Sequence, residues 1–130
     1  MGAVLLDTTV VIDVLRGRSA TIRLEQLLAA GDDPFVCVVT IEEAVRGLRP
    51  GEEEATRNLF DGLYLAQLGD SEGWRAGEWR RELARGGVTI SQADSLIAAA
   101  AHSIGGRLAT GNPKHFPLPE LAVEHWPAGE

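Results

Sequence analysis

Three acidic residues follow short apolar or β-branched runs at points where a helix is expected to begin. They are Asp7 in AVLLDTTVVIDVLRG, Glu43 in FVCVVTIEEAVRG and Asp94 in VTISQADSLIAAAA. In an open α/β sheet, the strand ends and the helix starts that follow them converge on one crevice. Carboxylates gathered there repel one another unless a cation neutralises them. The pattern therefore predicts a divalent-metal site formed by these three acids.

Each acid also has a simpler explanation as a helix cap. The segment TIEE matches a capping box, in which the Glu43 side chain would bond the Thr40 amide. The segment SQAD, which ends at Asp94, fits a looser form of the same pattern. Asp7 lacks this spacing, and the two threonines after it already supply hydroxyl caps. The joint placement of the three acids favours a shared metal site over three independent caps.

The elements expected to position these acids alternate between strands and helices. Apolar and β-branched runs predict strands at 4–6, 35–39, 107–110 and 122–125. Helical periodicity and the capping and glycine signals predict helices at 9–15, 20–29, 40–46, 51–66, 70–85 and 91–104. This alternation is typical of an α/β fold with a mostly parallel sheet of four or five strands. We expect a single domain over residues 1–130.

Composition and charge limit the classes of partner. The net charge of −7 argues against broad, non-specific binding to nucleic acid. It does not exclude a nuclease, because bound cations would offset the site acids and local arginines can hold phosphates. Arg16, Arg46 and Lys114 are expected near the crevice, where they would contact phosphate. The start of the chain does not resemble a signal peptide, and Cys37 is the only cysteine, so we expect a cytoplasmic protein.

Four segments taken together resemble the PIN-domain nucleases, and in particular the small VapC-type toxin ribonucleases of bacterial toxin–antitoxin pairs. They are LLDTTVVID, IEEAVRG with Glu43 four residues before a glycine, DSLIAAAA and TGNPKHF. The resemblance covers nearly the whole chain. It implies a three-layer PIN-like fold and endonucleolytic cleavage of RNA by a water activated on Mg²⁺ or Mn²⁺. It assigns the metal to Asp7, Glu43 and Asp94, with Glu42 as the rival to Glu43.

The resemblance also implies a homodimer and a small antitoxin protein that covers the crevice. Leu15 and Leu24 on the early helices are possible contacts for the antitoxin, although both also fit the core. Thr8 and Thr9 are expected either to hold a water near the metal or to cap the first helix.

One departure from the family pattern bears on activity. Members often carry a fourth acid in the segment that corresponds to TGNPKHF, and this chain has none there. Asn112 and His115 are the only substitutes in the segment, the first as a neutral oxygen ligand and the second as a proton donor to the leaving group. The alternative function is therefore a PIN-like module that binds RNA or a protein with weak or no cleavage.

Other enzyme classes fit less well. Aspartyl-phosphate phosphatases and dehalogenases also begin with a strand that ends in Asp, but they want a second Asp where Thr9 stands. A phospho-acceptor receiver domain needs a strand-end acid near mid-chain, where Asp61 falls within a helical pattern instead. The chain has no P-loop, HExxH, zinc-spaced cysteines or GxSxG motif.

Overall fold

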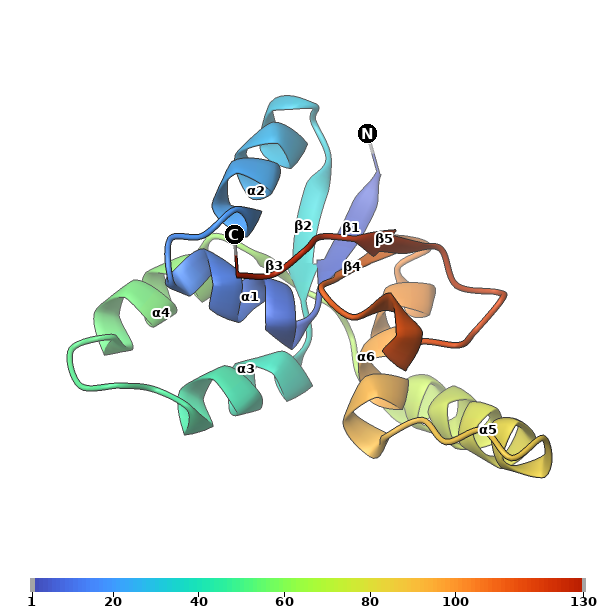
Figure 1. Cartoon of the computed structure of the whole chain (residues 1–130). Helices are drawn as coiled ribbons and strands as arrows, with labels where there is room; N and C mark the ends of the chain where they lie inside the picture. Colours follow the sequence, from blue (N-terminus) through green and yellow to red (C-terminus); the bar gives the residue numbers. More distant parts are fainter. Residues whose placement is uncertain (1, 130) are drawn as a thin grey trace.

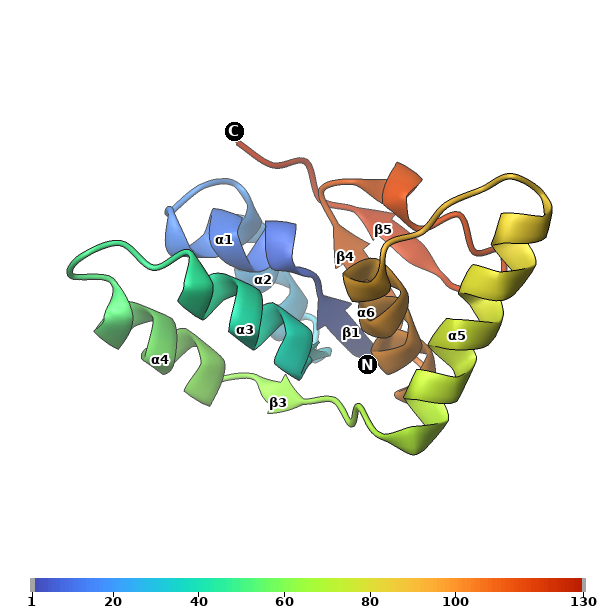
Figure 2. The same ribbon diagram turned by 90° about the horizontal axis from the view of Figure 1, so that it is seen from below.

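A five-stranded parallel sheet lies between two groups of helices in the computed structural model, which describes residues 2–129 (Figures 1 and 2). The strands are β1 (Ala3–Leu6), β2 (Asp33–Val36), β3 (Tyr64–Leu65), β4 (Arg107–Thr110) and β5 (Val123–His125). The helices are α1 (Thr8–Leu15), α2 (Ala20–Ala29), α3 (Val38–Arg46), α4 (Glu53–Asp61), α5 (Asp70–Arg85), α6 (Gln92–Ser103) and the short 3₁₀ helix η1 (Pro113–His115). The predicted three-layer α/β fold is confirmed. No helix within the described residues has the length and apolar character needed to cross a membrane.

The strand order β3-β2-β1-β4-β5 creates a crevice at the centre of the sheet. After β1 the chain passes to β2 on one side, whereas β4 and then β5 lie on the other side. In such a sheet, ligands bind outside the carboxyl ends of the two strands at which the order reverses. Those strands are β1, which Asp7 follows, and β4, which ends at Thr110.

Alternate residues of the central strands enter two separate cores. Leu5 and Leu108 belong to the core beneath α5 and α6, whereas Val4, Leu6 and Ala109 belong to the core beneath α1 and α2. This is the side-chain alternation of a strand buried on both faces. On the first side, α6 presents four consecutive buried alanines, residues 98–101, whose small side chains allow it to pack closely on the sheet. Both cores hold the carboxyl ends of β1 and β4 in fixed positions.

The boundary between β2 and α3 differs from the sequence-based prediction. A strand was expected over 35–39 and a helix from Thr40, but β2 ends at Val36 and α3 begins at Val38. The β-branched pair at 38–39 favours a strand intrinsically, and tertiary packing overrides that preference. Thr40 therefore lies inside the first turn of α3, so the alternative explanation of Glu43 as part of a capping box with Thr40 does not hold.

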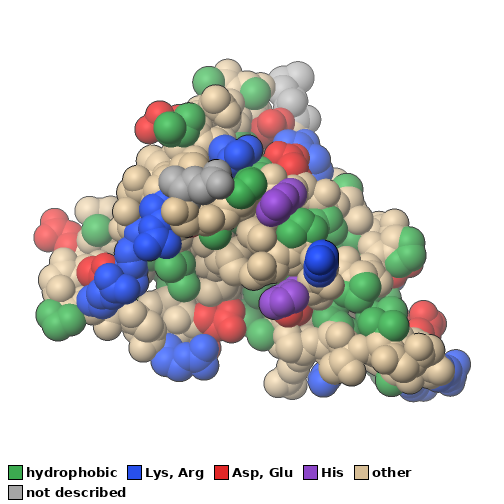
Figure 3. All heavy atoms as spheres, viewed as in Figure 1, with side chains coloured by type: hydrophobic (Ala, Val, Ile, Leu, Met, Phe, Trp, Pro, Cys, Tyr) green, Lys and Arg blue, Asp and Glu red, His purple; other side chains and the backbone are tan. Residues whose placement is uncertain are grey.

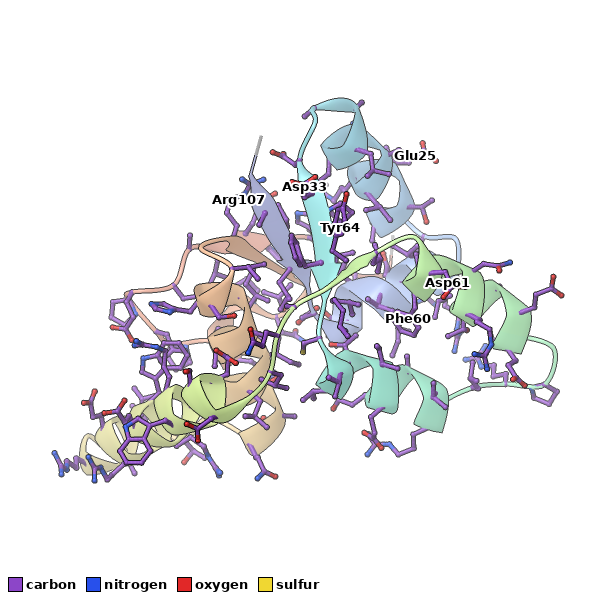
Figure 4. All side chains as sticks on the ribbon, turned by 180° about the vertical axis from the view of Figure 1, so that it is seen from behind. Glu25, Asp33, Phe60, Asp61, Tyr64 and Arg107 are labelled. Carbon is purple, nitrogen blue, oxygen red and sulfur yellow. The ribbon has the colours of Figure 1, made fainter. Side chains whose placement is uncertain are left out.

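The structure also adds an edge strand that the sequence pattern concealed. The helix predicted over 51–66 ends at Asp61, and Tyr64–Leu65 form β3 beside β2. The Tyr64 ring lies against the Phe35 ring, with the centroids 5.3 Å apart, on the face shown in Figure 4. Two residues carry too little periodicity to separate a strand from the end of an amphipathic helix.

Candidate functional site

Asp7 is the central residue of the crevice because backbone and side-chain contacts fix it from both strands. Its amide donates to the Ala109 carbonyl at 3.0 Å, which continues the β1–β4 ladder by one residue. Its Oδ1 caps α1 by accepting from the Val10 amide at 3.0 Å and from Thr9 Oγ1 at 2.6 Å. Its Oδ2 accepts from Thr110 Oγ1. A carboxylate has about four acceptor sites, so Oδ2 keeps one lone pair for a ligand.

The environment of Asp7 disfavours its negative charge. The side chain is only 4% exposed. Burial raises the pKa of the Asp7 carboxyl above its ordinary value, the hydrogen bonds from Thr110, Thr9 and Val10 lower it in part, and the nearby negative charge of Asp94 raises it further. Two carboxylates that influence each other at a buried position are arranged to receive a cation.

Glu43 is held by a hydroxyl from α1 rather than by its own helix. Thr8 Oγ1 donates to Glu43 Oε1 at 2.6 Å and lies 3.0 Å from Thr40 Oγ1. Because the single proton of the Thr8 hydroxyl goes to Glu43, the Thr40 hydroxyl must donate to Thr8. Thr40 is fully buried, so the hydroxyl that bonds Thr8 is held in a fixed position by the surrounding core. Glu43 is thereby brought beside Thr8, the residue that follows Asp7.

Glu42 and Glu43 are the two candidates for the crevice on α3, and their side chains face in different directions. Glu42 is 62% exposed and lies 3.8 Å from Arg46 on the outer side of α3. Glu43 faces α1 through Thr8. The structure therefore places Glu43, and not Glu42, at the crevice.

Asp94 lies in the first turn of α6 and faces the segment after β4. The Ser91 hydroxyl caps α6 by accepting from the Asp94 amide at 3.0 Å. No reciprocal bond from the Asp94 carboxylate to the Ser91 amide occurs in the part of the chain that the structure describes, so only half of the predicted capping pattern forms. Asp94 Oδ2 instead lies 3.7 Å from His115 Nδ1. Its carboxylate is thus free of a capping role.

The segment after β4 brings His115 close to Asp94. The Asn112 amide donates to Thr110 Oγ1 at 2.9 Å and its carbonyl accepts from the His115 amide at 3.0 Å. Its side chain is exposed and makes no hydrogen bond within residues 2–129. Acidic and histidine side chains lie close together near the centre of the face in Figure 3, where α1, α3, α6 and η1 approach one another.

The acids share this region without a basic partner. Among residues 2–129, no Lys or Arg forms an ion pair with Asp7, Glu43 or Asp94. In the same residues, no three Asp, Glu, His or Cys side chains are close enough together to hold a metal ion. Asp94 is near enough to Asp7 to raise its pKa, and Glu43 is linked to the residue after Asp7 through the Thr8 hydroxyl. The donor set itself, oxygens with one nearby imidazole, suits a divalent cation.

The three basic residues expected at the crevice are placed differently. Arg16 caps the far end of α1 and forms an ion pair with Glu52 at 2.7 Å, so its guanidinium is already engaged. Arg46 lies one turn beyond Glu43 and is 69% exposed. Lys114 is exposed beside His115 in η1. Arg46 and Lys114 remain available to a phosphate, whereas Arg16 does not.

Sequence reasoning missed the residues that orient Asp7. Thr110 bonds it directly, and Gly111 donates its amide to Thr9 Oγ1 at 2.8 Å. A Cβ at Gly111 would lie 3.1 Å from Thr9 Oγ1, so a side chain there would press on this contact. The only sequence signal that Thr110 and Gly111 help to orient Asp7 was their position at the end of an apolar strand.

Comparisons with known proteins match nearly the whole chain to one family and one fold. The family model described as PIN domain matches residues 4–119. Ribonuclease VapC19 of Mycobacterium tuberculosis is 29% identical over 119 residues, which are 90% of this chain and 95% of the relative. Ribonuclease VapC10 of the same species is 33% identical over 116 residues, 88% of this chain and 86% of the relative. The crystal structure of VapBC2 from Rickettsia felis, bound to a DNA fragment from their promoter, has a TM-score of 0.83 at 24% identity and covers 95% of this chain and 98% of its own.

Proposed function

The chain belongs to the PIN-domain family, and from this membership and its acidic crevice we propose that it is a divalent-metal-dependent endoribonuclease. We further propose that it is the toxin of a toxin–antitoxin pair, as the names of its relatives indicate. The observation that carries the proposal is the buried Asp7 carboxylate, which lies near Asp94 and has no Lys or Arg partner within residues 2–129.

The proposed roles follow from how each carboxylate is held. A Mg²⁺ or Mn²⁺ ion bound here would lower the pKa of a coordinated water and stabilise charge on the phosphoryl oxygens. Asp7 offers the free lone pair of Oδ2, and Asp94 offers a carboxylate without a capping bond. Glu43 keeps one carboxylate oxygen outside its bond to Thr8 and serves as a ligand or as the base that orients the water. Arg46 and Lys114 bind the RNA phosphates that flank the scissile bond.

We propose that the antitoxin contacts the groove between α3 and α4, which lie side by side in Figure 2. The groove has a volume of about 350 Å³ and its apolar walls include Ile41, Val45 and Phe60. Val45 is 52% exposed, so an apolar partner would remove it from water. For Leu15 and Leu24, the core packing that the sequence also allowed is observed, since Leu24 is buried beneath α1 and α2 and Leu15 packs against the same core. A homodimer and a cytoplasmic location remain predictions.

The test of the proposed function is cleavage of labelled RNA with Mg²⁺, with Mn²⁺ and with a chelator. We expect metal-dependent cleavage by the wild type and a loss of at least about 100-fold in rate for Asp94→Asn, which removes a ligand charge. Asp70→Asn is the matched control, because Asp70 is an exposed acid in the first turn of α5. Its rate should equal that of the wild type.

Two outcomes would contradict the nuclease. Equal cleavage in the chelator and in Asp94→Asn would show that the RNA is cut by a contaminant. Metal-dependent RNA binding without any product would instead support a PIN-like binding module that does not cleave, which is the alternative raised by the missing fourth acid.

Thr8→Val is expected to slow cleavage about ten- to a hundredfold, because it removes the only side-chain hydrogen bond that Glu43 accepts within residues 2–129 and keeps the β-branched shape. Thr8→Ser keeps the hydroxyl and should restore most of the rate. The free energy of unfolding, measured in urea, should fall by about 1–2 kcal/mol in Thr8→Val, because the buried Thr40 hydroxyl loses its acceptor, and should change little in Thr8→Ser. Equal rates for the valine and serine variants would show that Thr8 does not position Glu43.

A further inference from the structure

The contact between His115 and Asp94 points to a metal ligand that is not a carboxylate. We propose that His115 Nδ1 and Asp94 bind the same divalent cation, so that an imidazole stands in the place of the missing fourth acid. The proposal rests on the proposed nuclease function, because it concerns the cation of that same site. It decides between the two substitutes, Asn112 and His115, that the sequence left open.

The distance between the two groups fits a shared ion. A carboxylate oxygen and an imidazole nitrogen that each lie about 2.1 Å from one cation are about 3.0 to 4.2 Å apart, depending on the angle at the metal. Asp94 Oδ2 and His115 Nδ1 are 3.7 Å apart. That distance is too long for a direct hydrogen bond.

The Thr110 hydroxyl, which orients the Asp7 carboxylate, also helps to fix the position of His115. Thr110 Oγ1 donates to Asp7 and accepts the Asn112 amide, and the Asn112 carbonyl then accepts the His115 amide. On the other side of His115, the buried Phe116 anchors η1 in the core beneath α5 and α6. The imidazole is therefore carried on a short segment fixed at both ends, although the ring itself is 61% exposed and open to an ion from solvent.

The chemical consequence is a change in metal preference. Mg²⁺ is bound in proteins mainly by carboxylates and water, whereas imidazole suits later transition metals. Replacing a carboxylate with a neutral imidazole also removes one negative charge from the ligands. The site should therefore prefer Mn²⁺ and especially Co²⁺ over Mg²⁺ more strongly than a site built from four acids.

The direct test is spectroscopy of the full chain with Mn²⁺ alone. A directly bound imidazole nitrogen modulates the electron spin echo of Mn²⁺, so we expect this modulation in the wild type and its loss in His115→Ala. His125→Ala is the matched control, because His125 is an exposed histidine on the neighbouring β5. It should keep the modulation.

Calorimetric titration with Co²⁺ and with Mg²⁺ measures the predicted preference. His115→Ala should weaken Co²⁺ binding at least about tenfold and Mg²⁺ binding much less. His115→Asp should tighten Mg²⁺ binding and lower the ratio of Co²⁺ to Mg²⁺ affinity by about tenfold. These variants lie at an exposed position, so their folding is not expected to change.

The outcomes separate this proposal from the proposed function. Mn²⁺ binding that Asp94→Asn abolishes, but that shows no nitrogen modulation, overturns the role of His115 and leaves the metal-dependent nuclease standing. Failure of the wild type to bind Mn²⁺ or Co²⁺ at all overturns both. Equal loss of Co²⁺ and Mg²⁺ affinity in His115→Ala also contradicts a selective imidazole ligand.

Discussion

Asp7→Asn should reduce metal-dependent RNA cleavage by about a thousandfold or more while making the metal-free protein more stable at neutral pH. The loss of activity follows from removal of the charge that would hold the cation at the centre of the crevice. Asn is as good an N-cap as Asp, so α1 keeps its cap and the fold its shape. Single-turnover cleavage rates and urea unfolding of the same preparations would measure the two effects.

The gain in stability follows from the raised pKa of Asp7. Below its ordinary pKa of 3.8, the Asp7 carboxyl is mainly protonated in both the folded and the unfolded protein, so its burial does not cost the free energy of burying a charge. As the pH rises from the ordinary pKa through the higher pKa of the folded state, the unfolded protein releases this proton more readily than the folded one. The free energy of unfolding therefore decreases. Asn never ionises, so the variant should be more stable than the wild type at pH 7, and the difference should shrink as the pH falls below the ordinary pKa of an aspartate.

Added Mn²⁺ should make the wild type more stable than Asp7→Asn, because the ion stabilises only the protein that binds it. Asp33→Asn is the control, since Asp33 is an exposed acid at the opposite end of the sheet (Figure 4). It should change neither the cleavage rate nor the response to Mn²⁺. A metal-free Asp7→Asn protein less stable than the wild type at pH 7 would show that burial of the Asp7 charge does not oppose folding.

Asp13→Ala should lower the free energy of unfolding by about 2–4 kcal/mol, the largest stability effect that we expect from a single side chain in this protein. Asp13 is 2% exposed, and its two oxygens accept from the Ala20 amide at 3.0 Å and from the Gly129 amide at 2.9 Å. Ala20 is the first residue of α2, and its N-cap residue Ser19 makes no side-chain cap. Alanine would leave the Ala20 amide buried without an acceptor and would release the amide of the exposed Gly129.

The measurement is the midpoint of urea unfolding at an unchanged slope. Glu25→Ala is the matched control, because Glu25 is an exposed acid on α2 (Figure 4) and should change stability by less than about 0.5 kcal/mol. Asp13→Asn keeps one acceptor oxygen and should fall between the two. If Asp13→Ala were no more destabilising than Glu25→Ala, the two amides would not depend on Asp13.

Asp7 and Asp13 show how far the sequence could separate function from structure. Both lie in LLDTTVVID, and spacing alone makes either a possible site residue. The sequence placed Asp7 at the carboxyl end of the first strand, where the structure also has it, because it directly follows a buried apolar run. The structural role of Asp13 was not predicted, because its partners are 7 and 116 residues away in the sequence.

The local signals in the sequence determined the order of the strands and helices apart from β3, the parallel sheet and the position of Asp7 at its carboxyl edge. Periodicity, glycine stops and helix caps act over a few residues, so they can be recognised without a structure. Tertiary structure alone decided that α3 begins before Thr40, that Thr8 holds Glu43 and that His115 lies close to Asp94. These outcomes depend on contacts between elements far apart in the chain, where packing outweighs the local preference of any one segment.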